Sequence, residues 1–105
     1  MRGIRVDPGS DGAVCVSGEL DMGVAEGFVE SVLSSLDSQA ELVLDVERLE
    51  FIDSTGIRAL LELARRVQPT PLVVRSPRPN VAKVFEIVNI DALGIRVERG
   101  PTQHI

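Results

Sequence analysis

The sequence predicts an α/β fold in which helices pack against a β-sheet. Short apolar runs that suit strands alternate with longer segments whose apolar residues recur every three or four positions, as on one face of a helix. The predicted order is strand, strand, helix, strand, helix, strand, helix, strand. Strands that alternate with helices favour a sheet covered by helices. A chain of 105 residues has the size of one domain, which we expect to span residues 1–105.

The first two strands are predicted to form a hairpin. Residues 4–6 alternate between apolar and charged side chains, and residues 13–16 form an extended apolar run. Between them, residues 7–12 are rich in the turn formers Asp, Pro, Gly and Ser. Cys15, the single cysteine, lies in the second strand, where we expect its thiol to be buried and to behave as a small apolar group.

The first helix is predicted over residues 23–37. Its apolar stripe consists of residues spaced by four, namely Val24, Phe28, Val32 and Leu36. Asp21 lies just before this stripe. We therefore expect Asp21 to act as the N-cap by accepting hydrogen bonds from backbone N–H groups of the first turn.

The remaining elements follow in the same alternating order. Residues 42–46 form a nearly continuous apolar run, which is typical of a strand buried on both faces in a parallel sheet. After residues 51–56 the apolar positions return to helical spacing and continue to Val67, before two prolines that end the helix. The last predicted segments are a buried strand at 72–74, a helix at 80–88, a strand at 95–97 and a loose tail at 98–105.

Composition and charge exclude several classes of partner. The net charge is −5 and the pI is about 4.8, so the surface repels nucleic-acid phosphates and anionic lipid headgroups. With three Phe and no Tyr or Trp, the chain also offers few aromatic faces for stacking bases. No run approaches the roughly 20 apolar residues that span a bilayer, and no signal peptide follows Arg2 and Arg5. We expect a cytoplasmic protein with no direct nucleic-acid partner and no membrane insertion.

The most informative local feature is the start of the second helix, at Asp53, Ser54, Thr55 and Gly56. Two interpretations stay open from the local chemistry. In the first, the residues simply cap the helix, because Asp, Ser and Thr are favoured at N-caps. Alternatively, a hydroxyl there is functional, because free N–H groups and the helix dipole would receive a phosphate attached to it. In that case Gly56 leaves space for the backbone of a partner.

A resemblance supports the functional interpretation. Gly18-Glu19-Leu20-Asp21 after a strand, followed by Leu44-Asp45-Val46 and then Phe51-Ile52-Asp53-Ser54-Thr55-Gly56-Ile57, resembles the STAS domain of bacterial anti-anti-sigma factors, also called anti-sigma factor antagonists. The later segments Ser76-Pro77 and Val81-Ala82-Lys83-Val84-Phe85-Glu86-Ile87 resemble the third-helix region of that family. The resemblance spans about residues 12–98 and implies a STAS-like mixed four- to five-stranded β-sheet with helices packed against it.

The resemblance also implies a mechanism and assigns roles to residues. In that family the serine after the aspartate is phosphorylated by an anti-sigma factor serine kinase and dephosphorylated by a PP2C-type phosphatase. Only the unphosphorylated form binds the anti-sigma factor and thereby frees the sigma factor. By position, Ser54 is the phosphoacceptor and Asp21 is an acidic residue near it. The residues expected to flank the site or contact the partner are Asp21, Met22, Asp53, Thr55, Gly56 and Ile57.

Other chemistries find little support in the sequence. His104 is the single histidine and Cys15 the single cysteine, which leaves no Cys–His pair and no metal cluster. Nothing in the spacing of Asp45 and Asp53 forces them into a catalytic pair, and the glycines form no phosphate-binding loop. Thr55 suits a buried or capping role better than that of a phosphoacceptor. We expect a binding protein and not an enzyme, with no cofactor and no metal.

Two alternatives to a phosphorylation switch remain. The same fold serves as a cytosolic STAS accessory subunit of lipid-transport ABC systems, and co-purification with an ABC ATPase would favour that function. The other alternative is a scaffold that is never phosphorylated, in which Ser54 is only a helix cap. Absence of added phosphate after treatment with the cognate kinase and ATP would favour the scaffold.

Overall fold

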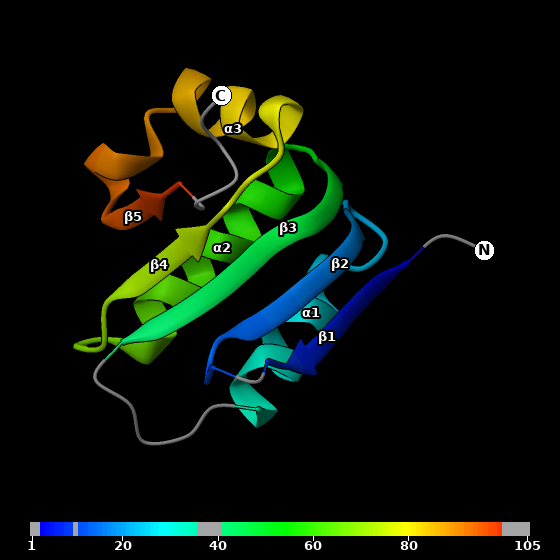
Figure 1. Ribbon diagram of the computed structural model, residues 1–105, viewed down its shortest axis with the longest axis vertical. Helices are drawn as coiled ribbons and strands as arrows, with labels where there is room; N and C mark the ends of the chain where they lie inside the picture. Colours follow the sequence, from blue (N-terminus) through cyan, green and yellow to red (C-terminus); the bar gives the residue numbers. More distant parts are fainter. Residues whose placement is uncertain (1–2, 10, 36–40, 100–105) are drawn as a thin grey trace.

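The computed structural model of the chain describes residues 3–9, 11–35 and 41–99 (Figure 1). The predicted order of strands and helices is confirmed, with one additional 3-10 helix, η1, before the last strand. The elements are β1 (Ile4–Pro8), β2 (Val14–Leu20), α1 (Ala25–Ser34), β3 (Leu42–Ile52), α2 (Ser54–Val67), β4 (Leu72–Arg75), α3 (Pro79–Ile87), η1 (Ile90–Leu93) and β5 (Ile95–Glu98).

The strands form one five-stranded sheet in the order β1-β2-β3-β4-β5. β1 and β2 are antiparallel and form the predicted hairpin, whereas the other three neighbouring pairs are parallel. The mixed sheet implied by the resemblance is therefore confirmed. Because β2 and β3 run in the same direction, both strands end at the same edge of the sheet.

The hydrophobic core lies between the sheet and the helices α1 and α2, which are on the same side of it (Figure 1). Phe28 and Val32 of α1 and Leu60 and Leu63 of α2 are almost completely buried together with Leu44 of β3. Each such side chain contributes about 1.5–3 kcal/mol of hydrophobic stabilisation. This packing fixes the two helices on the sheet.

The face of the sheet opposite α1 and α2 is only partly buried, which corrects the expectation that residues 42–46 are buried on both faces. Within residues 42–46 only alternate residues are buried, while Val43 and Asp45 are half-buried. The Arg75 guanidinium lies 3.0 Å from a carboxylate oxygen of Asp45 and 2.9 Å from one of Asp11. Ion pairs thus cover part of this face. A short apolar run fits a strand with one such face as well as a strand buried on both faces, so the pattern alone did not distinguish them.

Cys15 lies on the same face as Asp45, its neighbour across the β2–β3 pair. Its thiol is half-buried and not fully buried as predicted. Burial nevertheless raises the pKa of the Cys15 thiol, and the carboxylates of Asp45 and Asp11 raise it further. The thiol is therefore protonated at neutral pH.

The start of α1 differs from the prediction. The helix begins at Ala25 and not at residue 23, and Val24 occupies the N-cap position without a side-chain hydrogen bond. Asp21 does not cap the helix: its side chain accepts a hydrogen bond of 3.0 Å from the Gly23 N–H, and its backbone carbonyl accepts one from the Val24 N–H. Asp21 therefore stabilises a turn between β2 and α1. α1 ends at Ser34, and residues 36–37 lie outside the described residues.

β3 is longer than predicted and extends to Ile52 because it stays paired with β2 through two irregularities in register. β4 pairs only with the first four residues of β3, as far as Asp45. Beyond that point, side chains at the start of α3 bind the strand: Arg78 donates to the Glu47 carbonyl and Asn80 to the Glu50 carbonyl, at 3.0 and 2.8 Å. These bonds hold the carboxyl half of β3 in place.

The end of the chain is close to the prediction. α3 begins at Pro79, which suits the first position of a helix, and not at residue 80. β5 includes Glu98, so the tail does not begin at residue 98. Residues 100–105, including His104, lie outside the described residues. No helix in the described part of the chain has both the length and the apolar character needed to cross a bilayer.

Candidate functional site

The candidate site lies where β2 and β3 end side by side. Leu20 and Ile52 are paired across the two strands, and the Asp53 N–H donates a hydrogen bond of 3.3 Å to the Leu20 carbonyl. The next residues of both strands therefore emerge at the same edge. The structure thus brings the segment of Asp21 close to that of Ser54, as the resemblance implied.

Asp53 is the N-cap of α2. Its side-chain Oδ1 accepts hydrogen bonds from the backbone N–H groups of Thr55 and Gly56, at 3.0 and 3.1 Å. The N–H groups expected to receive a phosphate are therefore already bound to a carboxylate. This corrects the idea that free N–H groups of the first turn await a phosphate on the neighbouring hydroxyl.

Thr55 is tied to the same carboxylate. Its hydroxyl donates a hydrogen bond of 2.6 Å to Oδ1 of Asp53, and the side chain is half-buried. The predicted structural role of Thr55 is confirmed by this bond. Its hydroxyl is consequently poorly placed to serve as an acceptor of a phosphoryl group.

Ser54, by contrast, is exposed at the first position of α2. Across residues 3–9, 11–35 and 41–99, no group forms a hydrogen bond with its hydroxyl. The two interpretations of this segment, a helix cap and a functional hydroxyl, therefore apply to different residues. Asp53 caps the helix with help from Thr55, while the Ser54 side chain takes no part in the cap.

The hydrogen bonds at the cap also determine the charge of Asp53. The Thr55 hydroxyl has the largest effect in lowering the pKa of the Asp53 carboxyl, and the N–H groups of Gly56 and Thr55 lower it further, while burial opposes them. The carboxylate is charged at neutral pH. A phosphate on Ser54 would therefore carry its charge next to an existing anion.

Gly56 and Ile57 lie inside the domain. A Cβ on Gly56 would lie 2.5 Å from the Leu20 carbonyl oxygen and 2.6 Å from a side-chain carbon of Ile52. The glycine is needed because α2 approaches the end of β2 closely. Ile57 is only 6% exposed. These positions correct the expectation that a partner packs flat against Gly56 and Ile57.

Two exposed apolar side chains belong to the segments that lead into the site. Met22, predicted as a contact residue, is 77% exposed, and Phe51 is 44% exposed. Phe51 was not predicted as a site residue, although it stands next to the buried Ile52 in a strand, where neighbouring side chains point to opposite faces. Sequence reasoning also missed Arg58, which is exposed four residues after Ser54, a spacing that places two side chains together on a helix.

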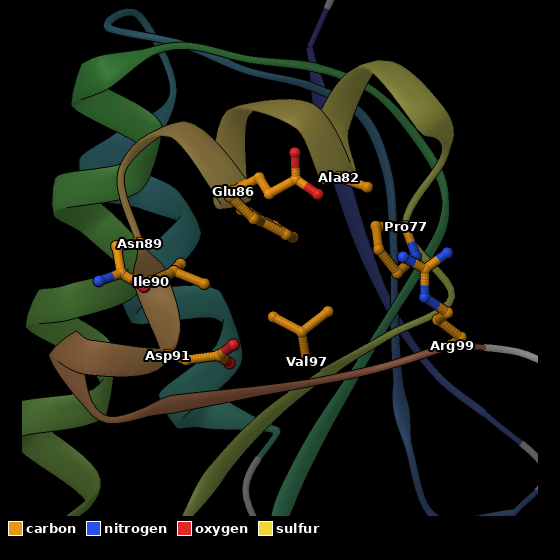
Figure 2. A pocket seen from close by; sticks show the side chains of 9 residues that line it. Pro77, Ala82, Glu86, Asn89, Ile90, Asp91, Val97 and Arg99 are labelled. Carbon is orange, nitrogen blue, oxygen red and sulfur yellow. The ribbon is translucent and has the colours of Figure 1, made fainter.

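A cavity of about 240 Å³ lies elsewhere, between α3, η1 and β5 (Figure 2). Figure 2 shows the carboxylates of Glu86 and Asp91 on one side and Arg99 on another, with Val97 between them. The described residues that line it include no Ser, Cys or His. No group of three or more His, Cys, Asp or Glu side chains in the described part of the chain is arranged to hold a metal ion.

Comparisons with known proteins agree on one family. A family model described as "Mlab, STAS domain" matches residues 6–96. BtrV of Bordetella bronchiseptica, which carries the name of an anti-sigma factor antagonist, is 32% identical over 76 residues, covering 70% of this chain and 66% of its own length. The match thus spans slightly less than two thirds of that relative.

Two solved structures share the fold. An anti-sigma factor antagonist from Mycobacterium paratuberculosis superimposes with a TM-score of 0.75 at 24% identity, covering 98% of this chain and 88% of that one. The anti-sigma factor antagonist SpoIIAA in its unphosphorylated form superimposes with a TM-score of 0.63 at 22% identity, covering 90% of this chain and 87% of that one. At these identities the likeness establishes the fold.

Proposed function

The chain belongs to the STAS domain family, and on that premise we propose that it is an anti-sigma factor antagonist controlled by phosphorylation of Ser54. The observation that carries the proposal is the state of the Ser54 hydroxyl. It is exposed and makes no hydrogen bond within the described residues, while both its neighbours are bound to each other. The names of the similar proteins support the same function.

The proposed cycle has two forms of the protein. The unphosphorylated form binds an anti-sigma factor that is also a serine kinase, and this binding releases the sigma factor. The kinase transfers the γ-phosphoryl group of ATP to Oγ of Ser54, which loses its proton, and ADP leaves. A PP2C-type phosphatase hydrolyses the phosphate ester and regenerates the serine and inorganic phosphate. The protein is thus a binding partner and a substrate in the cytoplasm, and the chemistry belongs to the other two proteins.

The sign of the switch follows from the electrostatics of the site. A phosphate adds about −1.5 to −2 charges at neutral pH. Since Asp53 occupies the N–H groups of Thr55 and Gly56, the phosphate is directed toward solvent and thus toward the partner. A charged group that loses its water in the interface without gaining a partner there weakens binding by about 2–4 kcal/mol, or roughly 30- to 1000-fold. The fold is left intact.

The proposal is tested by calorimetric titration of the protein with the serine-kinase anti-sigma factor of the same organism. Ser54→Ala should bind like the natural protein, whereas Ser54→Asp should lose at least 30-fold in affinity. With the kinase and labelled ATP, the natural protein and Thr55→Val should incorporate phosphate and Ser54→Ala should not. Equal binding by Ser54→Ala and Ser54→Asp would contradict the switch, and labelling of Ser54→Ala would contradict the assigned residue.

The transporter alternative has a specific reason to be tested alongside. The description of the matching family model names a STAS domain and no anti-sigma function. Affinity purification from the native organism distinguishes the two functions. Recovery of an ABC ATPase in place of a serine kinase would favour the accessory subunit of a lipid-transport system.

A further inference from the structure

We propose that the Arg58 guanidinium binds the phosphate on Ser54, so that the phosphorylated site holds its own counter-ion within α2. The proposal rests on the assignment of Ser54 as phosphoacceptor. It adds a residue whose role is to position and partly neutralise the phosphate.

The first argument is the geometry of the helix. Ser54 and Arg58 occupy the first and fifth positions of α2 and are both exposed. Side chains four residues apart lie on the same face of a helix, with Cβ atoms about 5–6 Å apart. Helical side chains also lean toward the N-terminus, so the long Arg58 side chain extends back over the turn that contains Ser54. A phosphate on Oγ of Ser54 is therefore within its reach.

The second argument is that Arg58 has no ion pair within the described part of the chain, unlike the other two arginines of α2. Arg65 lies 2.6 Å from a carboxylate oxygen of Glu62, and Arg66 lies 3.0 Å from one of Glu30. Arg58 is thus free to change position without breaking a bond. A planar guanidinium also suits phosphate oxygens, because it can donate two parallel hydrogen bonds to them.

The third argument is that the start of α2 offers no other positive side chain to neutralise the phosphate. Asp53 already occupies the N–H groups of Thr55 and Gly56 and contributes a negative charge of its own. Asp21 lies in the turn after β2, and Glu26 of α1 lines the groove between α1 and α2 together with Arg58. Both are anions, and Arg58 is the only cation in the first two turns of α2.

The test uses protein with phosphoserine incorporated at position 54 during synthesis, so that no kinase or partner is needed. The second ionisation of the phosphate is followed by ³¹P nuclear magnetic resonance as a function of pH. An adjacent guanidinium favours the dianion. The phosphate of Arg58→Gln should therefore bind its last proton about two- to fourfold more tightly than the phosphate of the protein that keeps Arg58. Arg58→Lys should give an intermediate value because it keeps the charge without the paired donors.

The matched control is Arg48→Gln, which removes the same charge from another exposed position, on β3. The phosphate of this variant should titrate as in the natural sequence. Identical titration in the natural, Arg58→Gln and Arg48→Gln proteins, all folded by circular dichroism, would overturn the proposal, and so would equal shifts in the two Gln variants. Either result would leave the role of Ser54 in partner binding untouched, because that role is measured by a different assay.

Discussion

The Thr55 hydroxyl donates a 2.6 Å hydrogen bond to the Asp53 carboxylate, so the two residues that flank Ser54 are bound to each other across it. The same carboxylate oxygen accepts hydrogen bonds from the N–H groups of Thr55 and Gly56. One aspartate therefore fixes the start of α2 while leaving the neighbouring serine exposed. The cap and the proposed switch lie side by side but use different atoms, so they can be separated by mutation.

Removal of the cap should reduce stability without touching Ser54. We expect Asp53→Ala to lower the free energy of unfolding by about 1 kcal/mol, because two N–H groups and the Thr55 hydroxyl lose their acceptor. Asp53→Asn should keep most of the stability, since asparagine also caps helices. Urea denaturation of the three proteins measures the difference. Equal losses in both variants would show that the charge, and not the cap, matters.

The cap should also make stability depend on pH in the acid range. The pKa of Asp53 is lowered in the folded protein, chiefly by the Thr55 hydroxyl. A lowered pKa means that the contribution is fully present above the ordinary aspartate pKa of about 3.9 and is lost as the pH falls through the lower folded value. The free-energy difference between the natural protein and Asp53→Asn should therefore shrink below about pH 4. Urea titrations at pH 7 and pH 3 test this, and a constant difference would contradict it.

Gly56 should tolerate no side chain. In Gly56→Ala the added methyl group would meet the Leu20 carbonyl and Ile52 at 2.5 and 2.6 Å, so we expect a loss of about 1–3 kcal/mol in unfolding free energy. Gly27→Ala in α1 is the matched control, because nothing lies within 4 Å of its added Cβ. That control should gain about 0.5–1 kcal/mol from better helix propensity. Thermal unfolding distinguishes the two, and a stable Gly56→Ala protein would show that α2 can move away from β2.

The exposed apolar side chains in the segments that lead to Ser54 should matter for binding. Phe51→Ser and Met22→Ser should each weaken binding of the anti-sigma factor by about 10-fold or more, since exposed apolar anchors carry much of an interface's energy. Ile87→Ser and Leu93→Ser are the controls, because these residues are 72% and 50% exposed but lie on α3 and η1. The Met22 and Ile87 variants, at the two most exposed of these positions, should unfold within about 0.5 kcal/mol of the natural protein. Calorimetric titration would contradict the assignment if the control variants lost as much affinity as Phe51→Ser.

Several features of the tertiary structure could not be predicted from local pattern. Asp21 was expected to cap α1, but the helix begins two residues later and Asp21 stabilises the preceding turn. β3 was expected to end near residue 46, yet it stays paired with β2 as far as Ile52, and Arg78 and Asn80 bind its carbonyl groups beyond the end of β4. The length of β3 depends on contacts with segments far away in the chain, which a local window of sequence does not contain. The bonds of Asp21 are local, but caps and turns favour the same residue types, so the pattern did not separate the two.

The sequence by itself determined the order of the elements and the position of α2, because helical and strand periodicities and cap chemistry are local properties. The choice of Ser54 rested on the resemblance to the STAS domain, since the local chemistry also fitted a plain helix cap. Only the tertiary structure decided how the residues around Ser54 divide their roles. The close approach of α2 to β2 buries Gly56 and Ile57, so they support the site from inside. That approach is a matter of packing between strands and a helix, and it leaves the Ser54 side chain exposed at the surface.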